Sequence, residues 1–575
     1  MIIFNDLRRL LAKPATSLQL GLLGVLAGCA SALVIILFRQ TIAIAQSFFL
    51  HQPDNFTQLD IVVRSSLPLL AVVFMLIIGI GANKRDFQMG ITFAIHWIKV
   101  KKGAMPFRNA FYQFFGGAAA LISGFSVGRE GPSVHIGATM ASYVGDILRL
   151  PYNSIRTLTG CGIAAGIAAS FNTPVAAVIF VMEVVFREYK IHVFVPIMLA
   201  SVTGTLLTRL VFGDEHELSV FSQTSFSDIN YAYLLLCSIV IGGVAYLFNS
   251  SLIHTSKRFK PIKIYYRLAI AAVITAWIGV LVPQALGSGM GAVQFTVTDS
   301  AHATEWTAFL FILAILLAKF VATVFALGLG VPGGLIGPIL GIGVLLGSLF
   351  GLISQFSGAP GNQVALYAVL AMAGLMAATL HSPLAALLTI FELTTNPDLI
   401  LPAMLVIAVS YTISVQVFGN RSIFIQQLDA QQLPYRISPA MQTLQKVGVL
   451  DQLNRNFKLT YDEDEQKARE QLLDTPNNTA LIYANLDIFS SEFKLIEFEE
   501  NIQYKNNSLA INNAQMKFTP MQGLSAQATL AEAFELIHHR REGAVFIYQD
   551  SPDDIIGIIK WDQLRKLLIE RNNFL

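Results

Sequence analysis

Long runs of mostly apolar residues recur along the chain and limit the folds that it can adopt. A helix needs roughly 20 such residues to cross the hydrocarbon core of a bilayer. Of the 575 residues, only 13% are charged, whereas soluble proteins have about 25%. The sequence therefore predicts an all-α polytopic membrane domain. The predicted spans are Leu18–Phe38, Ser66–Ala82, Ile191–Phe212, Ala232–Phe248, Leu268–Val282, Ala308–Leu329 and Leu401–Val417.

A second kind of segment lies between these spans and is rich in Gly, Ala and Pro. Interrupted helices inside a membrane are tolerated only where the freed backbone lines a cavity that is buried in protein or filled with water. Transporters place their binding sites at such breaks, so we expect a site where these segments meet. They are Phe111–Val127, Gly160–Glu183, Gly333–Ile353 and Val364–Glu392, with interruptions expected at Pro132, Pro174, Pro338 and Pro383.

Two of the interrupted segments repeat each other. In Asn172–Pro174 the proline is followed nine residues later by Glu183, and in His381–Pro383 it is followed at the same distance by Glu392. This correspondence indicates two inverted-topology repeats with broken helices and a binding site at their interface. The alternative is a coincidental likeness between two packing helices that are rich in small residues.

A change to polar composition near Leu428 predicts three parts, an N-terminal cytoplasmic segment (1–14), a transmembrane domain (15–428) and a cytoplasmic tail (429–575). Basic residues at the N-terminus and in Lys257–Lys263 indicate the cytoplasmic side of the cell membrane. The end of the tail predicts a small α/β domain. Its expected elements, in the order helix, strand, strand and helix, are Ala528–Arg541, Gly543–Tyr548, Ile555–Ile559 and Trp561–Ile569.

Several functional classes find little support in the sequence. A net charge of +2 is too small for a nucleic-acid binder, and the three cysteines have neither a disulfide nor a metal-ligand pattern. His96, His135 and His381 are scattered and lack the clustered partners that an intramembrane hydrolase needs. We therefore do not expect an enzyme, although a membrane-embedded enzyme or sensor remains the alternative outside ion transport.

Glu130 is the strongest candidate for a functional residue. It lies in an apolar neighbourhood within Gly128–Pro132, where the Gly and Pro suit the start of a helix. A helix N-terminus binds anions through its unpaired N–H groups and its partial positive charge. A carboxylate there can occupy the anion site itself, so protonation of Glu130 would free that site. The alternative is a structural pair between Glu130 and Arg129.

The counterpart in the second half is Pro332–Pro338. Its glycines allow close backbone approach, and Leu335 and Ile336 can offer backbone N–H groups that hold an anion weakly, as conduction requires. The alternative is a packing turn between helices. Lys319 is the lone charge in Ala308–Leu329, and it either attracts anions, extends to the interface or pairs with a carboxylate.

These motifs resemble those of the CLC family of anion channels and proton-coupled antiporters, over roughly residues 15–428. Gly128–Pro132 resembles the family signature with its gating glutamate, and Gly333–Pro338 stands where the family has a second anion-binding motif. The resemblance implies a homodimer in the lipid bilayer, with one pathway per subunit for chloride or other small anions and, in coupled members, for protons. The anion-binding positions that it implies are Met89, Gly90, Arg129, Gly131, Leu335, Ile336 and Phe424.

The tail is similar to one CBS motif, a regulatory module. The resemblance implies that an adenine nucleotide is a possible ligand of the tail, and no other cofactor or metal is expected. The alternative is an unrelated small α/β domain.

The chain departs from the family pattern at three positions. Met89 replaces a serine and Phe424 replaces a tyrosine, so the central anion site loses two hydroxyl donors, each worth about 1 kcal/mol or more. Val184 replaces the internal glutamate that follows Glu183 in proton-coupled members, and a valine cannot relay a proton.

These departures favour a passive or weakly proton-coupled chloride channel that is gated by protonation or movement of Glu130. One alternative is a chloride/proton antiporter whose internal proton route uses a different carboxylate, with Glu183 as the candidate. Another is a fluoride-selective member, because fluoride-exporting relatives also carry methionine at the position of Met89.

Overall fold

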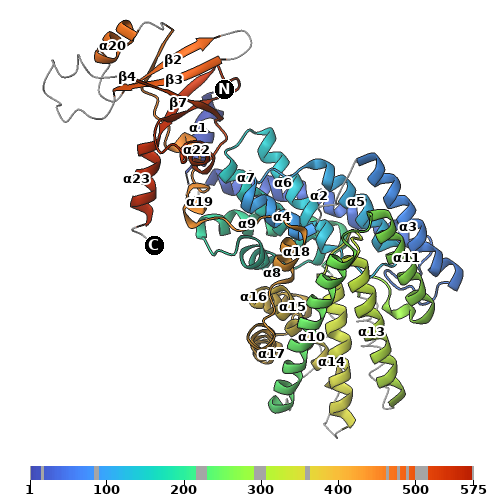
Figure 1. The fold of residues 1–575 in the computed structure, drawn as a ribbon. Coiled ribbons are helices and arrows are strands. Elements are labelled where there is room, and N and C mark those ends of the chain that lie inside the picture. Colours follow the sequence, from blue (N-terminus) through green and yellow to red (C-terminus); the bar gives the residue numbers. More distant parts are fainter. Residues whose placement is uncertain are drawn as a thin grey trace. The chain divides into compact units, whose positions relative to one another are not determined.

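The computed structural model of the chain forms two compact units (Figure 1). We call Leu20–Asp146 with Arg156–Arg436 the membrane unit, and Met1–Gln19, Ile147–Ile155 and Ile437–Leu575 together the terminal unit. The structure describes residues 2–13, 18–82, 90–214, 230–289, 306–356, 363–461, 465–474, 479–486, 491–498 and 516–572.

The membrane unit is helical. Among the described residues, eight helices are long and apolar enough to cross a membrane. Seven of them correspond to the seven predicted spans, and the eighth, Ile336–Phe356, lies in the segment Gly333–Ile353 that was expected to be interrupted. The eight helices are α2 (Leu18–Ser47), α3 (Ile61–Ala82), α9 (Ile191–Phe212), α10 (Tyr231–Phe259), α11 (Ile264–Leu281), α13 (Trp306–Gly328), α14 (Ile336–Phe356) and α17 (Ile400–Thr412), which continues into the π-helix η6 (Ile413–Val417).

Further helices of the membrane unit include those that carry the predicted site. Pro174 and Pro383 begin helices, as expected, and the residues two positions before them, Asn172 and His381, adopt left-handed backbone with φ of 58° and 59°. These further helices are α4 (Gly90–Val100), α5 (Phe107–Ile122), α6 (Glu130–Ile147), α7 (Tyr152–Phe171), α8 (Pro174–Phe180), η1 (Val181–Phe186), α15 (Gln363–Leu380), α16 (Pro383–Thr394) and α18 (Ile423–Gln431).

The expected interruptions at Pro132 and Pro338 are corrected by the structure. Each proline is the third residue of its helix, α6 or α14, so neither helix is broken there. A proline is tolerated in the first helical turn because the N–H groups of that turn have no intrahelical acceptor.

Close backbone contacts fix these two helices against their neighbours. A Cβ atom on Gly137 of α6 would overlap the carbonyl oxygen of Gly162 on α7, and a Cβ on Gly347 of α14 would overlap that of Tyr367 on α15. Small residues allow membrane helices to pack this closely. The helices that begin with Glu130 and Ile336 are therefore each packed closely against the helix that follows in the chain, α7 in the first half and α15 in the second.

The terminal unit contains two sheets that share a core. In the first, the strand order is β1-β2-β3-β4, with β1 parallel to β2 and the other pairs antiparallel. In the second, β5 is parallel to β6, which is antiparallel to β7. The strands are β1 (Phe457–Thr460), β2 (Ala480–Leu486), β3 (Ser491–Phe498), β4 (Met516–Pro520), β5 (Gln522–Ser525), β6 (Ala544–Tyr548) and β7 (Ile555–Lys560).

The predicted order of helix, strand, strand and helix at the end of the tail is confirmed. It corresponds to α22 (Leu530–Ile537), β6, β7 and α23 (Trp561–Asn572). Buried apolar residues from both sheets pack together, among them Ile482 and Leu495 of the first and Phe546 and Ile558 of the second. The unit also contains α1 (Ile2–Leu11), α19 (Pro439–Leu444) and α20 (Glu465–Leu473).

Candidate functional site

The starts of α6 and α14 meet across a short backbone pairing. The N–H of Gly128 donates to the carbonyl oxygen of Gly334 at 2.8 Å, and the N–H of Gly334 donates back at 2.7 Å. A Cβ on Gly131 would lie only 2.5 Å from the oxygen of Gly333, so glycine is required for this approach. The structure thus brings the two predicted motifs together, with two helix N-termini at one place.

The carboxylate of Glu130 lies at this meeting point. The side chain is 1% exposed, and its Oε1 accepts a hydrogen bond of 2.7 Å from the N–H of Gly337 in the first turn of α14. Oε2 is buried and has no hydrogen-bond partner among the described residues. Glu130 therefore occupies the position at the N-terminus of α14 where an anion would bind.

The other predicted anion-binding residues differ in where they lie and in what they contact. Leu335 and Ile336 are buried at the start of α14, and the anion-binding role of their backbone remains a prediction. The guanidinium of Arg129 lies 4.8 Å from the centre of the Phe171 ring. Gly90 begins α4 with φ of +75° and is buried, and a Cβ on it would meet none of the described residues within 4 Å. Met89 lies outside the described residues.

Phe424 lies near the start of α18 and is buried. Its ring contacts Phe180 of α8 edge to face, with 6.3 Å between the ring centres. Thr92 of α4 donates a hydrogen bond of 2.6 Å to Gln427 of α18, so Gly90 and Phe424 lie on helices that are bonded to each other. The rings of Phe93 and His135 stack with 5.5 Å between their centres, which joins α4 to α6.

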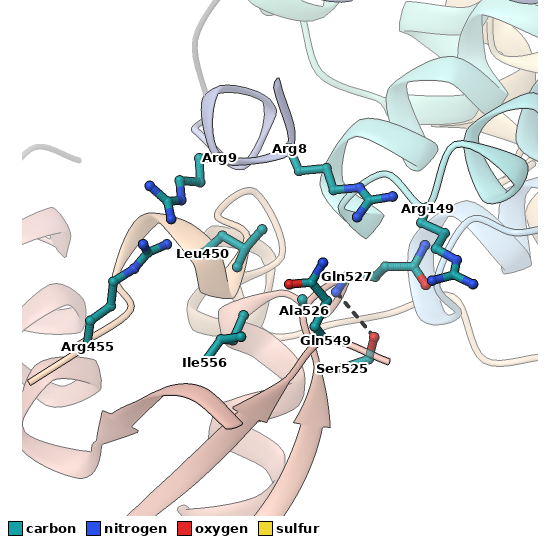
Figure 2. A pocket seen from close by; sticks show the side chains of 10 residues that line it. All are labelled: Arg8, Arg9, Arg149, Leu450, Arg455, Ser525, Ala526, Gln527, Gln549 and Ile556. Carbon is teal, nitrogen blue, oxygen red and sulfur yellow. Dashed lines mark hydrogen bonds between the residues drawn. The ribbon is translucent and has the colours of Figure 1, made fainter. Parts of the chain in front are cut away.

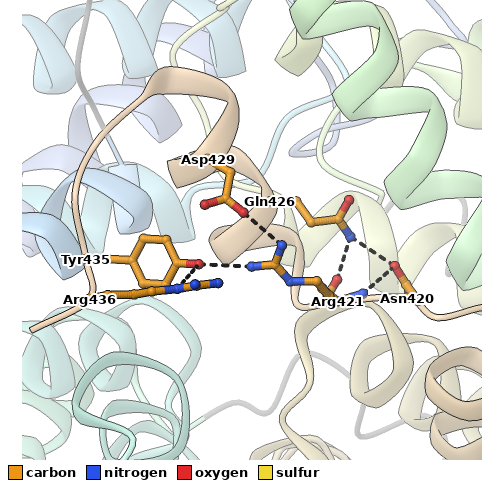
Figure 3. Close-up of polar contacts among 6 residues, drawn as sticks. All are labelled: Asn420, Arg421, Gln426, Asp429, Tyr435 and Arg436. Carbon is orange, nitrogen blue, oxygen red and sulfur yellow. Dashed lines mark hydrogen bonds and ion pairs between the residues drawn. The ribbon is translucent and has the colours of Figure 1, made fainter. Parts of the chain in front are cut away.

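A polar network fixes the start of α18 (Figure 3). The side-chain amide of Gln426 donates to Asn420 Oδ1 at 3.0 Å and to the carbonyl oxygen of Arg421 at 2.6 Å. The guanidinium of Arg421 pairs with Asp429 at 2.9 Å and donates to the Tyr435 hydroxyl at 2.9 Å. These bonds hold the turn before α18 and thereby fix the position of Phe424.

Glu183 and Glu392, the matched glutamates of the repeat, cap each other's helices. Glu183 accepts hydrogen bonds from the N–H groups of Leu384 and Ala385 at 3.2 and 2.9 Å, at the start of α16. Glu392 does the same at 2.9 and 2.8 Å for Val175 and Ala176 of α8. The matching positions of these glutamates in the repeat identified them as a pair, and in the structure both carboxylates cap a helix N-terminus. The predicted proton route through Glu183 remains a prediction.

Val184, the other position of the predicted proton route, is buried in the π-helix η1. The first repeat has one residue more than the second between its capping glutamate and the left-handed residue that ends the helix, Arg187 in the first copy and Thr395 in the second. A π turn absorbs one extra residue, and such turns are common at functional sites. The two repeats therefore differ in length at this position.

Lys319 is fully buried and bonds backbone oxygens. Its ammonium donates to the carbonyl oxygens of Ala285 and Gly287 at 3.1 and 2.6 Å. The next residue, Ser288, donates from its N–H and its hydroxyl to Asp54 at 2.9 and 2.8 Å. Because Lys319 is fully buried, it does not extend to the interface, and its hydrogen bonds go to backbone oxygens rather than to a carboxylate of the described residues. Its attraction of anions remains a prediction. No sequence motif pointed to Asp54.

This turn borders the Glu130 site. A Cβ atom on Gly337 would lie 2.9 Å from Glu130 Oε1 and 3.0 Å from the carbonyl oxygen of Ser288. Lys319 and Asp54 therefore hold the backbone that lies beside the carboxylate, although neither side chain belongs to either motif.

Comparison with known proteins assigns this arrangement to a family. The family model described as voltage gated chloride channel matches residues 69–415. The chain belongs to the voltage gated chloride channel (CLC) family. The H(+)/Cl(−) exchange transporter ClcA of Salmonella agona strain SL483 is 30% identical over 328 residues, which cover 54% of this chain and 67% of the relative.

Two solved structures share the CLC fold. A slow cyanobacterial Cl−/H+ antiporter has a TM-score of 0.61 at 20% identity and covers 72% of this chain and 97% of its own. A eukaryotic CLC transporter has a TM-score of 0.59 at 16% identity, and the match covers 95% of this chain and 97% of the transporter's chain. The chain is therefore a multi-pass membrane protein for ion transport rather than an enzyme.

Proposed function

We propose that the chain is a chloride/proton exchange transporter in which one carboxylate, that of Glu130, competes with the anion and carries the proton. The observation that carries the proposal is the hydrogen bond from the N–H of Gly337 to the buried Glu130 carboxylate. Relatives such as ClcA are named H(+)/Cl(−) exchange transporters, which supports coupling over the passive channel that the sequence departures favour.

The chemistry follows from the geometry. While Glu130 is ionised, it holds the N–H groups at the start of α14 and blocks the anion. A proton on the carboxylate removes its charge and weakens these bonds, since hydrogen bonds to charged groups are the stronger ones. The side chain then leaves the site and an anion replaces it. When the carboxylate releases its proton on one side of the membrane and returns to the start of α14, it displaces the anion toward the other side of the membrane.

The proton needs a route to the inner side that does not use Val184. Both oxygens of Glu183 accept bonds from the start of α16, so this carboxylate would have to break its cap to take part. His135, five residues after Glu130 on α6, is fully buried and titratable. We infer that His135 is the better candidate for the inner route.

A passive chloride channel is the second candidate, because Val184 is buried where proton-coupled members carry a glutamate. Reconstituted protein separates the two functions. In liposomes with a chloride gradient and equal pH on both sides, an exchanger moves protons opposite to chloride and so builds a proton gradient, whereas a channel moves chloride alone. Repeating the assay with fluoride tests the fluoride-selective alternative.

Further features of the proposal follow the CLC resemblance. We place the protein in the cell membrane, with both termini in the cytoplasm, as a homodimer with one pathway per subunit. The residues after 429 form a CBS-like regulatory domain in this proposal. Cross-linking in native membranes tests the dimer, and protease accessibility of the termini tests the orientation.

A further inference from the structure

Four arginines of the terminal unit line one cavity of about 200 Å³. Arg8 and Arg9 come from α1, Arg149 from the segment between α6 and α7, and Arg455 from the segment before β1 (Figure 2). The remaining lining residues are Leu450, Ser525, Ala526, Gln527, Gln549 and Ile556.

The positive charge in this cavity is only partly balanced. Arg149 forms an ion pair with Asp550, and Arg9 lies 4.0 Å from Asp6, in both cases between exposed side chains. Exposed pairs of this kind contribute little, about 0–1 kcal/mol. Within the described residues, Arg8 and Arg455 form no ion pair with a carboxylate. Gathering like charges costs free energy, and a bound anion would offset that cost.

The arginines are arranged as two pairs. Figure 2 shows Arg9 and Arg455 pointing toward each other at one end of the cavity, and Arg8 directed toward the side of Arg149 at the other. Partial burial and the charge of Arg9 lower the pKa of Arg455, while Asp6 raises it. The Nε of Arg8 is buried without a hydrogen-bond partner among the described residues. The cavity thus presents positive charge at both ends and a donor that lacks an acceptor.

We propose that this cavity binds a compact anion with two phosphate groups. Planar guanidinium groups match phosphate oxygens with paired hydrogen bonds, and Ser525, Gln527 and Gln549 add neutral polar groups. The volume is below the roughly 300–1,000 Å³ of sites for drug-sized ligands, and none of the described lining residues is aromatic. The cavity therefore fits a diphosphate group, held free in solution or carried by a lipid with two phosphates, and offers no ring for stacking a nucleobase.

The cavity is linked through the chain to the transport site. Arg149 follows α6, the helix that begins with Glu130, by two residues and has a left-handed backbone with φ of 50°. A left-handed residue just after a helix is a common way for the helix to end, so Arg149 belongs to the C-terminal cap of α6. Gln527 fixes the same segment through two hydrogen bonds. Its side-chain Nε2 donates to the carbonyl oxygen of Leu150, and its backbone carbonyl oxygen accepts from the N–H of Tyr152. A ligand on Arg149 and Gln527 would alter the end of this helix, and any effect on transport rests on the proposed function.

Binding can be measured on the full-length protein, purified in detergent, by calorimetric titration with inorganic pyrophosphate. Arg455→Gln removes an arginine without an ion pair, and we expect binding to weaken about tenfold or more. Asp550→Asn keeps the shape of the side chain but frees Arg149 from its carboxylate, so binding should tighten. Arg565→Gln, at an exposed position on α23 away from the cavity, is the matched control and should bind like the unaltered protein.

A second arm tests the lipid source. The same variants are extracted from membranes that contain cardiolipin, and the retained cardiolipin is counted by native mass spectrometry. Loss of pyrophosphate binding in Arg455→Gln supports a soluble ligand, and loss of retained cardiolipin supports a lipid. The proposal is overturned if Arg455→Gln and Arg565→Gln behave alike toward both probes. Neither readout involves transport, so failure of the exchange mechanism would leave this result unaffected.

Discussion

Replacing Glu130 by glutamine tests the competition between carboxylate and anion. Glutamine has the same shape and can still accept a hydrogen bond from the N–H of Gly337 through its amide oxygen, but it carries no charge. A bond to a charged acceptor is worth about 1.5–3 kcal/mol and one to a neutral acceptor about 0.5–1.5 kcal/mol. The difference of about 1–1.5 kcal/mol corresponds to roughly a 5- to 12-fold change in the balance between side chain and anion.

We therefore expect Glu130→Gln to raise chloride flux by that factor, to remove its dependence on pH and to abolish coupled proton movement. The assay is chloride efflux from proteoliposomes, with the external pH recorded in the same sample. Glu535→Gln, an exposed position on α22, makes the same change of charge elsewhere and should alter neither flux. The reasoning is refuted if Glu130→Gln retains the flux, the pH dependence and the proton coupling of the unaltered protein.

Three further changes test other parts of the site. Glu392→Gln weakens two bonds to the start of α8, so the protein in detergent should lose about 1–3 kcal/mol of stability and melt at a lower temperature; an unchanged melting temperature would contradict the capping role. Phe424→Tyr adds a hydroxyl worth about 1 kcal/mol, so chloride should bind about fivefold more tightly by calorimetry, and unchanged affinity would show that Phe424 does not face the anion. His135→Gln should lower the number of protons moved per chloride; an unchanged ratio would remove His135 from the proton route.

The membrane spans and the place of Glu130 could be predicted because both depend on local pattern. A run of apolar residues must form a helix in a bilayer whatever surrounds it, and Gly128–Pro132 contains the elements of a helix start. The repeat also predicted that the two halves correspond. The pairing of Gly128 with Gly334 then follows from the inverted symmetry of the two motifs.

The supporting contacts could not be predicted, because they join residues far apart in the sequence. Asp54 and Lys319 meet the turn at 285–288 from different helices and loops, and nothing near either residue marks it. Glu183 and Glu392 were recognised by register, but their reciprocal capping depends on how α8 and α16 pack. The four arginines of the cavity come from three separated stretches of the chain, and no motif marks any of these stretches.

The central claim is that chloride and protons move through this protein in exchange. The most direct test places purified protein in liposomes with a chloride gradient, starts with equal pH on both sides and records protons as chloride flows. The account predicts proton movement opposite to chloride. An ionophore that carries protons should collapse the resulting pH difference, and Glu130→Gln should not produce one. Chloride flux without proton movement in the unaltered protein would contradict the account and support a passive channel.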